Sequence, residues 1–215
     1  MDLGDLNSVQ RAVGEINAIL GSEKVDILCA NAGISPSKYA TSVQGFETAF
    51  AVNCLGHHAL IMTLMKRQTL AQDARIVGTT GDIYCLSKDC KPDFRYRGRG
   101  IRAYCRSKLG NVWQYRQLAK RFPDLTVVLV HPGVVATELE GANTGISGFA
   151  KRMMMISPQL GAQASLIAAT QPFLSGSYFH NIHGIMNLTS DDAGMDDEKS
   201  DHFWNQLENL TAKNR

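Results

Sequence analysis

Apolar positions along this chain follow two spacings in turn, which predict helices that alternate with strands. In the stretch LNSVQRAVGEINAIL, Val9, Val13 and Ile16 recur at steps of three and four, as on the buried face of a helix. Similar patterns predict further helices at Val43–Leu70, Ile101–Phe122, Ser157–Phe173 and about Lys199–Ala212. Short β-branched runs predict strands at Val25–Ala30, Ala74–Thr80, Leu125–Gly133 and within GSYFHNIHGIMNLTS near the C-terminus.

Strands that are continuously apolar and separated by helices predict a parallel sheet covered on both faces, in an α/β fold. We expect residues 1–215 to form a single domain, with an acidic turn and helix over residues 190–215. Ligands of such sheets bind beyond the carboxyl ends of the strands. That rule selects four segments: Asn31–Gly33, Thr79–Gly81, His131–Gly133 and the residues after Gly176.

Composition narrows the function classes. A net charge of +2 indicates neither a nucleic acid nor a membrane surface as partner, and no apolar run reaches the roughly 20 residues of a membrane span. Five cysteines without a CxxC pair argue against a disulfide framework and for a reducing, cytoplasmic compartment. His180 and His183 offer two metal ligands without a third, so no metal site is predicted.

Four motifs occur in order at the predicted strand and helix ends: ANAG, VNCLGHHAL, Tyr104-x-x-x-Lys108 and VHPGVVATEL. Together they resemble the short-chain dehydrogenase/reductase family, and most of all its retinol-dehydrogenase-like and protochlorophyllide-reductase-like branch. The resemblance covers roughly residues 1–140. It implies a Rossmann-type three-layer α/β/α parallel sheet and a nicotinamide dinucleotide cofactor, NADP or NAD, of which we favour NADP.

Tyr104 and Lys108 stand four residues apart, so they share one helix face. A free tyrosine titrates near ~10, and a neighbouring ammonium lowers that pKa toward the working range of an acid/base catalyst. The resemblance implies that Tyr104 exchanges the substrate proton, while Lys108 also holds the cofactor ribose. It implies as well that Asn53 fixes a water linked to Lys108. A tyrosine that only packs on a surface helix is the alternative.

The resemblance also implies a set of cofactor contacts. Asn31, Ala32 and Gly33 would lie beside a ribose, since Gly33 has no side chain to obstruct it. An ordinary turn after a strand would use the same residues. The remaining expected contacts are Pro132 and Gly133 at the nicotinamide, Val135 and Thr137 at its carboxamide and the nearby phosphate, and Asp2 at the adenine.

The chain departs from the family in two ways. No TGxxxGxG turn is present, and the first strands that would carry it, some 60 residues of two βαβ units, are absent, so the Rossmann-type sheet is N-terminally truncated. An incomplete gene model and a natural short form both explain this, and whether Met1 is the true start stays open. Secondly, the family serine after the fifth strand aligns with Gly81. Thr80 beside it is either the substitute hydroxyl or a plain strand-end residue.

Two segments suggest partners. Residues 138–157 occupy the place of the family's substrate lid, and their methionines predict an apolar alcohol or carbonyl substrate. The loop Gly81–Gly100 and the start of the next helix carry eight basic residues: Lys88, Lys91, Arg95, Arg97, Arg99, Arg102, Arg106 and Lys108. One such patch on a near-neutral chain favours a solvated loop over a nucleic-acid site. The family suggests a homodimer through the helices Val43–Leu70 and Ile101–Phe122.

These observations predict an NAD(P)-dependent oxidoreductase that transfers a hydride between nicotinamide and an alcohol or carbonyl carbon. A catalytically inactive scaffold or binding protein of the same fold is the alternative. The missing glycine-rich turn and Gly81 favour the scaffold, whereas the retention of Tyr104, Lys108 and Asn53 together favours the enzyme.

Overall fold

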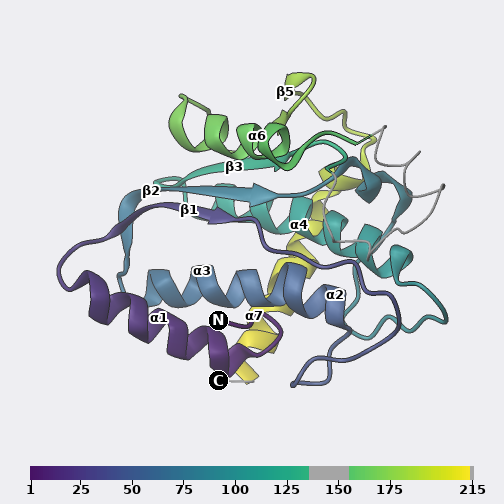
Figure 1. Ribbon diagram of the computed structural model, residues 1–215, viewed down its shortest axis with the longest axis horizontal. Helices are drawn as coiled ribbons and strands as arrows, with labels where there is room; N and C mark the ends of the chain where they lie inside the picture. The colour runs from purple at the N-terminus through teal and green to yellow at the C-terminus, as the bar shows by residue number, and fades with distance from the viewer. Residues whose placement is uncertain (136–154, 214–215) are drawn as a thin grey trace.

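A five-stranded sheet forms the centre of the computed structural model, which describes residues 1–135 and 155–213 (Figure 1). Its strands lie in sequence order: β1 (Val25–Ala30), β2 (Leu70–Thr79), β3 (Thr126–His131), β4 (Ser177–His180) and β5 (Gly184–Met186). The first four are parallel, and β5 runs antiparallel to β4. The predicted α/β fold is therefore confirmed.

Helices cover both faces of this sheet, which gives the three layers expected. The helical elements are α1 (Leu6–Leu20), α2 (Thr48–Phe50), the π-helical η1 (Ala51–Gly56), α3 (His57–Lys66), η2 (Asp82–Leu86), α4 (Ile101–Arg121), α6 (Pro158–Thr170), η4 (Ala193–Met195) and α7 (Asp197–Lys213). Figure 1 shows α6 above the sheet and α1, α3, α4 and α7 below it. Loops at the carboxyl ends of the strands gather on one side, where the sequence places its motifs.

The helix predicted over Val43–Leu70 is shorter and less regular than expected. It begins at Thr48 because the Glu47 carboxylate accepts hydrogen bonds from the backbone N–H groups of Ala49 and Phe50, as an N-cap does. It ends at Lys66, after which Gln68 adopts a φ of 55°. Strand β2 consequently starts at Leu70 and not at Ala74.

The segment GSYFHNIHGIMNLTS, predicted to hold one strand, forms the two strands β4 and β5. Ser177–His180 pairs with β3, and the chain then turns through Gly184, at a φ of 74°, into β5. A positive φ is readily adopted by glycine, which has no Cβ. The result is a hairpin at one edge of the sheet.

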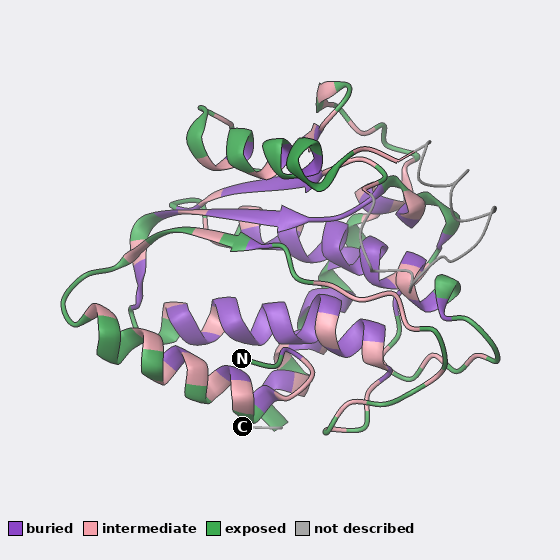
Figure 2. Ribbon diagram, in the orientation of Figure 1, coloured by how far each residue is buried: buried purple, intermediate pink, exposed green. Residues whose placement is uncertain are grey.

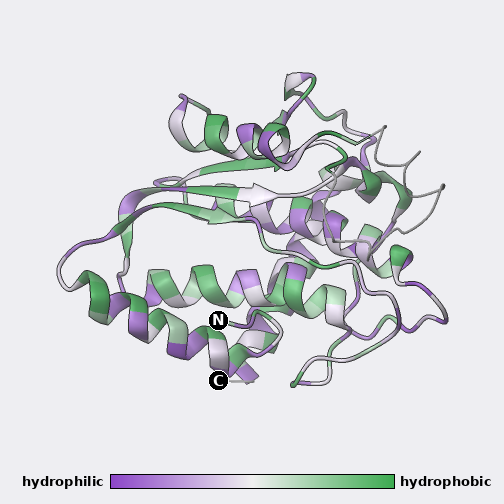
Figure 3. Ribbon diagram, viewed as in Figure 1, coloured by the Kyte–Doolittle hydropathy of each residue, from purple (hydrophilic) through white to green (hydrophobic). Residues whose placement is uncertain are grey.

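The main hydrophobic core lies between the sheet and the helices α3, α4 and α7. Along these elements, Figure 2 marks many residues as buried (purple) and Figure 3 marks many as hydrophobic (green). One contact in this core depends on a missing Cβ: the Tyr115 ring lies against Gly78 of β2, where an added Cβ would stand 2.5 Å from ring carbon Cε2. On the opposite face, Ala164 and Ala168 of α6 pack on the strand residues Val77, Val128 and Val130.

Strand β1 is the outer strand at the other edge. It pairs with β2 alone within the described part of the chain, and Ile27 remains 47% exposed. Unpaired edges and exposed apolar side chains of this kind invite pairing with further chain. Within the described residues, the strand Val25–Ala30 thus leaves its outer edge open.

Helix α7 lies across α3 and α4. Phe203 packs against the rings of Phe50 and Trp113, and Trp204 packs edge-on to His58. Both α7 side chains are buried. Helix α7 thus covers part of the two central helices, and the predicted homodimer through these helices stays a prediction.

The segment Thr48–Lys66 has the length and mean hydropathy of a membrane-spanning helix, the only one among the described residues to do so. Its most apolar stretch is 78% buried inside the protein, as in a core helix. Such a segment is weak evidence for a membrane span, and the absence of a span stays a prediction.

Candidate active site

The Lys108 ammonium lies in the interior at the carboxyl end of β2. Helix α4 directs the side chain beneath the strand, where Nζ donates to the carbonyl oxygen of Thr79 at 3.2 Å and the residue is 4% exposed. Burial lowers the pKa of Lys108 to about 8, because desolvation disfavours the charged form. The ammonium also lies 5.4 Å from the centre of the half-buried Tyr104 ring. The predicted pair therefore shares one face of α4.

Asn53 joins this helix to the loop after β1. Its Oδ1 accepts from the Ile34 backbone N–H at 2.8 Å, and Nδ2 donates both to Ile34 O at 3.0 Å and to Ser107 Oγ at 2.8 Å. Both amide hydrogens are thereby used, so a water bound to this side chain would have to donate to Oδ1. The π-helical turn Ala51–Gly56 carries Asn53, and single π turns often occur at functional sites.

Gly33 lies where Asn53 and Lys108 meet. A Cβ added to Gly33 would stand 3.3 Å from Asn53 Oδ1 and 3.8 Å from Lys108 Nζ. The three residues predicted from separate motifs are thus brought together by the fold. Without a side chain, Gly33 leaves space beside the buried ammonium, as a ligand held by Lys108 requires.

Thr80 is turned away from the sheet edge. Its hydroxyl donates to the carbonyl oxygen of Lys108 at 2.9 Å, and the residue is 2% exposed. Because the Thr80 hydroxyl already donates to helix α4, the structure does not support Thr80 as a replacement for the family serine. Gly81 is extended, with a φ of −169°, and an added Cβ would lie 3.5 Å from His131 Nδ1. A serine would therefore fit at position 81.

The loop after β3 holds part of the expected cofactor contacts. Gly133 has a φ of 91°, and a Cβ there would stand 2.8 Å from Ile156 Cδ1. Val135 forms a parallel bridge with Ile156, and the Pro132 carbonyl accepts from Asn181 Nδ2 at 3.0 Å. Thr137 and most of the predicted lid, residues 138–154, lie outside the described residues.

Asn31, Ala32 and Asp2 are the remaining predicted cofactor contacts among the described residues, in the N-terminal part of the chain. Thr79 Oγ1 donates to Asn31 Oδ1 at 3.3 Å, which ties the end of β1 to the end of β2, while Ala32 beside it is exposed. The exposed Asp2 accepts from the Gly4 N–H at 2.8 Å. Its predicted contact with adenine stays a prediction.

Sequence reasoning missed a cluster around Asp82. Tyr178 Oη donates to Asp82 Oδ1 at 2.7 Å, and His180 Nε2 lies 3.1 Å from Oδ2. His131 Nε2 lies 3.8 Å from the same oxygen. Asp82 follows β2, while His131 and His180 end β3 and β4. The rule that ligands bind beyond strand ends could therefore have indicated this cluster, but in the sequence His180 was considered only together with His183.

Asp82, His131 and His180 lie close enough together to bind a metal ion. The histidine nitrogens that face Asp82, however, carry protons and are not free to act as ligands. His131 Nδ1 accepts from the Asp82 N–H, and His180 Nδ1 accepts from the N–H groups of Ile182 and His183. Each Nε2 must then carry the proton, whereas a metal-bound histidine usually binds through one bare nitrogen and donates from the other. The histidines are better placed to hold the Asp82 carboxylate, and the absence of a metal stays a prediction.

The two histidines that begin α3, His57 and His58, are buried packing residues. His57 is 2% exposed, and burial together with the nearby Lys108 ammonium lowers its pKa to about 4. His58 Nε2 lies 2.8 Å from Glu208 Oε1 of α7. Both therefore belong to the supporting core of the site.

The sequence is similar to a known family model and to curated proteins. The family model described as enoyl-(acyl carrier protein) reductase matches residues 1–186. Human retinol dehydrogenase 12 is 38% identical over 83% of this chain and 59% of its own length, and human retinol dehydrogenase 13 is 31% identical over 99% and 67%. The chain thus spans about three fifths to two thirds of the length of these curated relatives.

Solved structures show the same fold. A crystal structure of an uncharacterised protein from Mycobacterium paratuberculosis superposes with a TM-score of 0.74 at 26% identity, over 99% of this chain and 74% of that one. The NADPH-bound carbonyl reductase from chicken fatty liver superposes with a TM-score of 0.63 at 16% identity, over 87% and 75%. With the family model matching most of the chain, the conclusion is that this protein belongs to the short-chain dehydrogenase/reductase family.

Proposed function

We propose that this chain carries the catalytic half of an NAD(P)-dependent oxidoreductase that interconverts an alcohol and a carbonyl compound. The observation that carries the proposal is the position of the Lys108 ammonium, buried 5.4 Å from the Tyr104 ring centre and held by Thr79. A buried cation next to a phenol favours the phenolate, and so prepares the phenol for proton exchange.

Tyr104 donates the proton to the carbonyl oxygen during reduction and takes it back during oxidation. Lys108 stabilises the charge that this exchange leaves on the phenol. Asn53 is a positioning residue, since its amide fixes Ile34 on one side and Ser107, three residues from Tyr104, on the other. A nicotinamide cofactor, when bound, supplies or accepts the hydride.

The structure fits one end of such a cofactor. Gly33 leaves room beside Lys108, and Gly133 provides a turn after β3 that any Cβ would disturb. We expect Gly33, Lys108 and Pro132–Gly133 to hold the nicotinamide and its ribose. The described residues contain no glycine-rich turn for the pyrophosphate, so affinity should be modest. NADP is our preferred form, since solved proteins with this fold include NADPH- and NADP-bound ones.

The substrate we propose is apolar. The curated relatives are named for retinol, an apolar alcohol. In this chain, the loop that follows β3 exposes Val134 and leads to the partly buried Met155 and Ile156. Apolar side chains at the mouth of a site favour substrates with little charge.

We further propose a reducing, cytoplasmic setting and no nucleic-acid partner. All five cysteines are free thiols. Within the basic loop, Asp89 pairs with Lys91 and Arg106, and the Arg106 guanidinium stacks on Phe94. Because these contacts already engage Lys91 and Arg106 within the protein, they favour a structural role for the basic loop over a nucleic-acid contact.

The inactive scaffold remains the second candidate, because Gly81 lacks a hydroxyl and Thr80 directs its own into α4. Calorimetric titration of the 215-residue chain with NADPH and NADH separates the two, combined with an assay of aldehyde reduction. We expect micromolar binding that Lys108→Ala abolishes and Lys120→Ala, on the exposed side of the same helix, does not.

Turnover should fall by about 10²–10⁴ in Tyr104→Phe and stay unchanged in the matched loop variant Tyr96→Phe. A folded chain that binds neither nucleotide and reduces no aldehyde would instead assign this protein to the scaffold class.

A further inference from the structure

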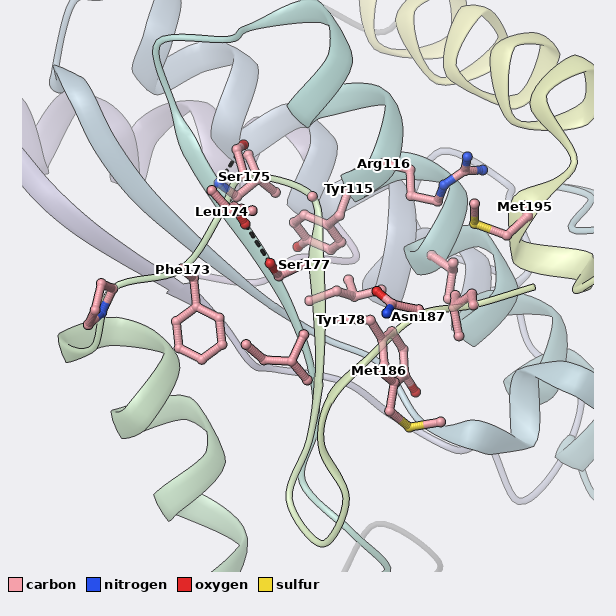
Figure 4. A pocket seen from close by; sticks show the side chains of 17 residues that line it. Tyr115, Arg116, Phe173, Leu174, Ser175, Ser177, Tyr178, Met186, Asn187 and Met195 are labelled. Carbon is pink, nitrogen blue, oxygen red and sulfur yellow. Dashed lines mark hydrogen bonds between the residues drawn. The ribbon is translucent and has the colours of Figure 1, made fainter. Parts of the chain in front are cut away.

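A cavity lies away from the strand ends that carry the candidate active site. It has a volume of about 480 Å³ and opens between α4, strand β3, the β4–β5 hairpin and the segment Phe173–Gly176 (Figure 4). This volume lies within the range of small-molecule sites, roughly 300–1,000 Å³. None of the residues assigned above to proton exchange or to the cofactor lines it.

The walls are mostly apolar: they include Val112, Leu129, Phe173, Leu174, Met186 and Leu188. Several polar groups in the walls are already satisfied. Ser177 Oγ donates to Leu174 O at 2.7 Å, and Ser175 Oγ donates to Leu125 O at 2.9 Å. Arg116 donates to the Gly194 carbonyl and to the Asp197 carboxylate. These groups offer little to a charged ligand.

Tyr115 is the exception. Its side chain reaches from α4 into the wall, with the hydroxyl directed toward Ser177 in Figure 4. The residue is 1% exposed, and its hydroxyl has no hydrogen-bond partner among the described residues. An unpaired buried hydroxyl is unfavourable, and native proteins rarely retain one. Burial raises the pKa of Tyr115, so the group stays protonated and is a hydrogen-bond donor that lacks an acceptor.

We propose that this cavity binds an uncharged, mainly apolar small molecule through one acceptor oxygen, which takes the hydrogen bond of Tyr115. A water molecule is a less favourable partner for Tyr115, because a buried water typically needs two to four polar partners. The hydroxyls of the neighbouring Ser175 and Ser177 already donate to backbone carbonyls. A carbonyl compound or ether meets the single donor and buries the rest of its surface against the apolar walls. A small movement at Ser177 or Leu174 gives its oxygen access to the hydroxyl.

The test is an NMR titration of the ¹⁵N-labelled 215-residue chain with acetophenone and with ethylbenzene, which matches it in shape but lacks the oxygen. We expect both to shift amide signals around the cavity, at Gly176, Ser177 and Asn187. Acetophenone should bind about five- to tenfold more tightly, the value of one net hydrogen bond. Tyr115→Phe should bring the two affinities together and leave the fold intact, because no hydrogen bond is lost.

A second variant tests whether the two probes bind inside this cavity. Ile185 lines the cavity and is 61% exposed, so Ile185→Trp should leave the core unchanged while it narrows the mouth and weakens both probes. The proposal is overturned by equal affinities for the two probes in the unmodified chain. It is equally overturned by signals that shift around Gly33 and Gly133 in place of the cavity, or by no binding up to the solubility limit.

Discussion

Lys108 Nζ donates to the carbonyl oxygen of Thr79 at 3.2 Å in a place that water hardly reaches. One hydrogen bond to a neutral carbonyl compensates only part of the desolvation of an ammonium group. The low pKa of Lys108, about 8 against 10.5, expresses that deficit. The cation that serves catalysis is therefore expected to reduce the stability of the fold.

Lys108→Met should raise the free energy of unfolding at pH 7, by on the order of 3 kcal/mol, because it removes a buried charge and keeps a similar volume. Between pH 8 and 10.5 the unfolded chain holds the lysine proton and the folded chain does not. The unmodified protein must then gain stability as pH rises through that window, and the variant must lack this gain.

Urea unfolding of both proteins from pH 7 to 11 measures this difference. The exposed Lys120 supplies the control, since Lys120→Met should run parallel to the unmodified protein across the window. If the curve for Lys108→Met also runs parallel, the lysine is not destabilised by burial and its assigned role loses its physical basis.

Gly81→Ser should raise the rate of carbonyl reduction. Position 81 has an extended backbone, and the added Cβ would meet His131 at an ordinary contact distance of 3.5 Å, so no strain is expected. A new hydroxyl there adds a donor for the oxyanion, and loss of one such donor elsewhere costs ~10²–10³ in rate. Steady-state kinetics should show the gain in kcat, and Gly81→Ala, which adds the Cβ without the hydroxyl, should show none. A serine no faster than alanine would mean that the reacting oxygen lies elsewhere.

Phe203→Ala should destabilise the protein by about 3–5 kcal/mol, as large truncations in a core do. Phe203 is 2% exposed between the rings of Phe50 and Trp113, and it fastens α7 to both central helices. The exposed neighbour His202 is the control, and His202→Ala should cost less than ~0.5 kcal/mol. Thermal or urea unfolding decides between them, and similar losses in the two variants would show that α7 is only loosely attached.

The sequence was informative where one physical rule acts locally. Apolar spacing predicted the helix Leu6–Leu20, whose Val9 and Val13 are fully buried, and the β-branched runs predicted strands β1 to β3. Boundaries failed where a cap or a turn decides them. The Glu47 carboxylate starts its helix five residues later than the apolar pattern suggested.

The site was predictable as far as strand ends and helix spacing reach. Lys108, Asn53 and Gly33 come together as their motifs implied. The direction of a hydroxyl depends on tertiary contacts, so the sequence could not show that Thr80 bonds to α4. The Asp82 cluster likewise requires that three strand ends be neighbours, which only the strand order supplies.

The π-helical turn Ala51–Gly56 has a consequence for anyone who redesigns this protein. Deleting one residue from it would restore regular α-helical hydrogen bonding, an obvious step toward a more robust scaffold. The same step would rotate Asn53 by roughly 100° relative to the residues on the far side of the deletion, and would take its amide from Ile34 or Ser107. A regular helix would thus give a more stable fold in which Asn53 no longer positions the candidate active site.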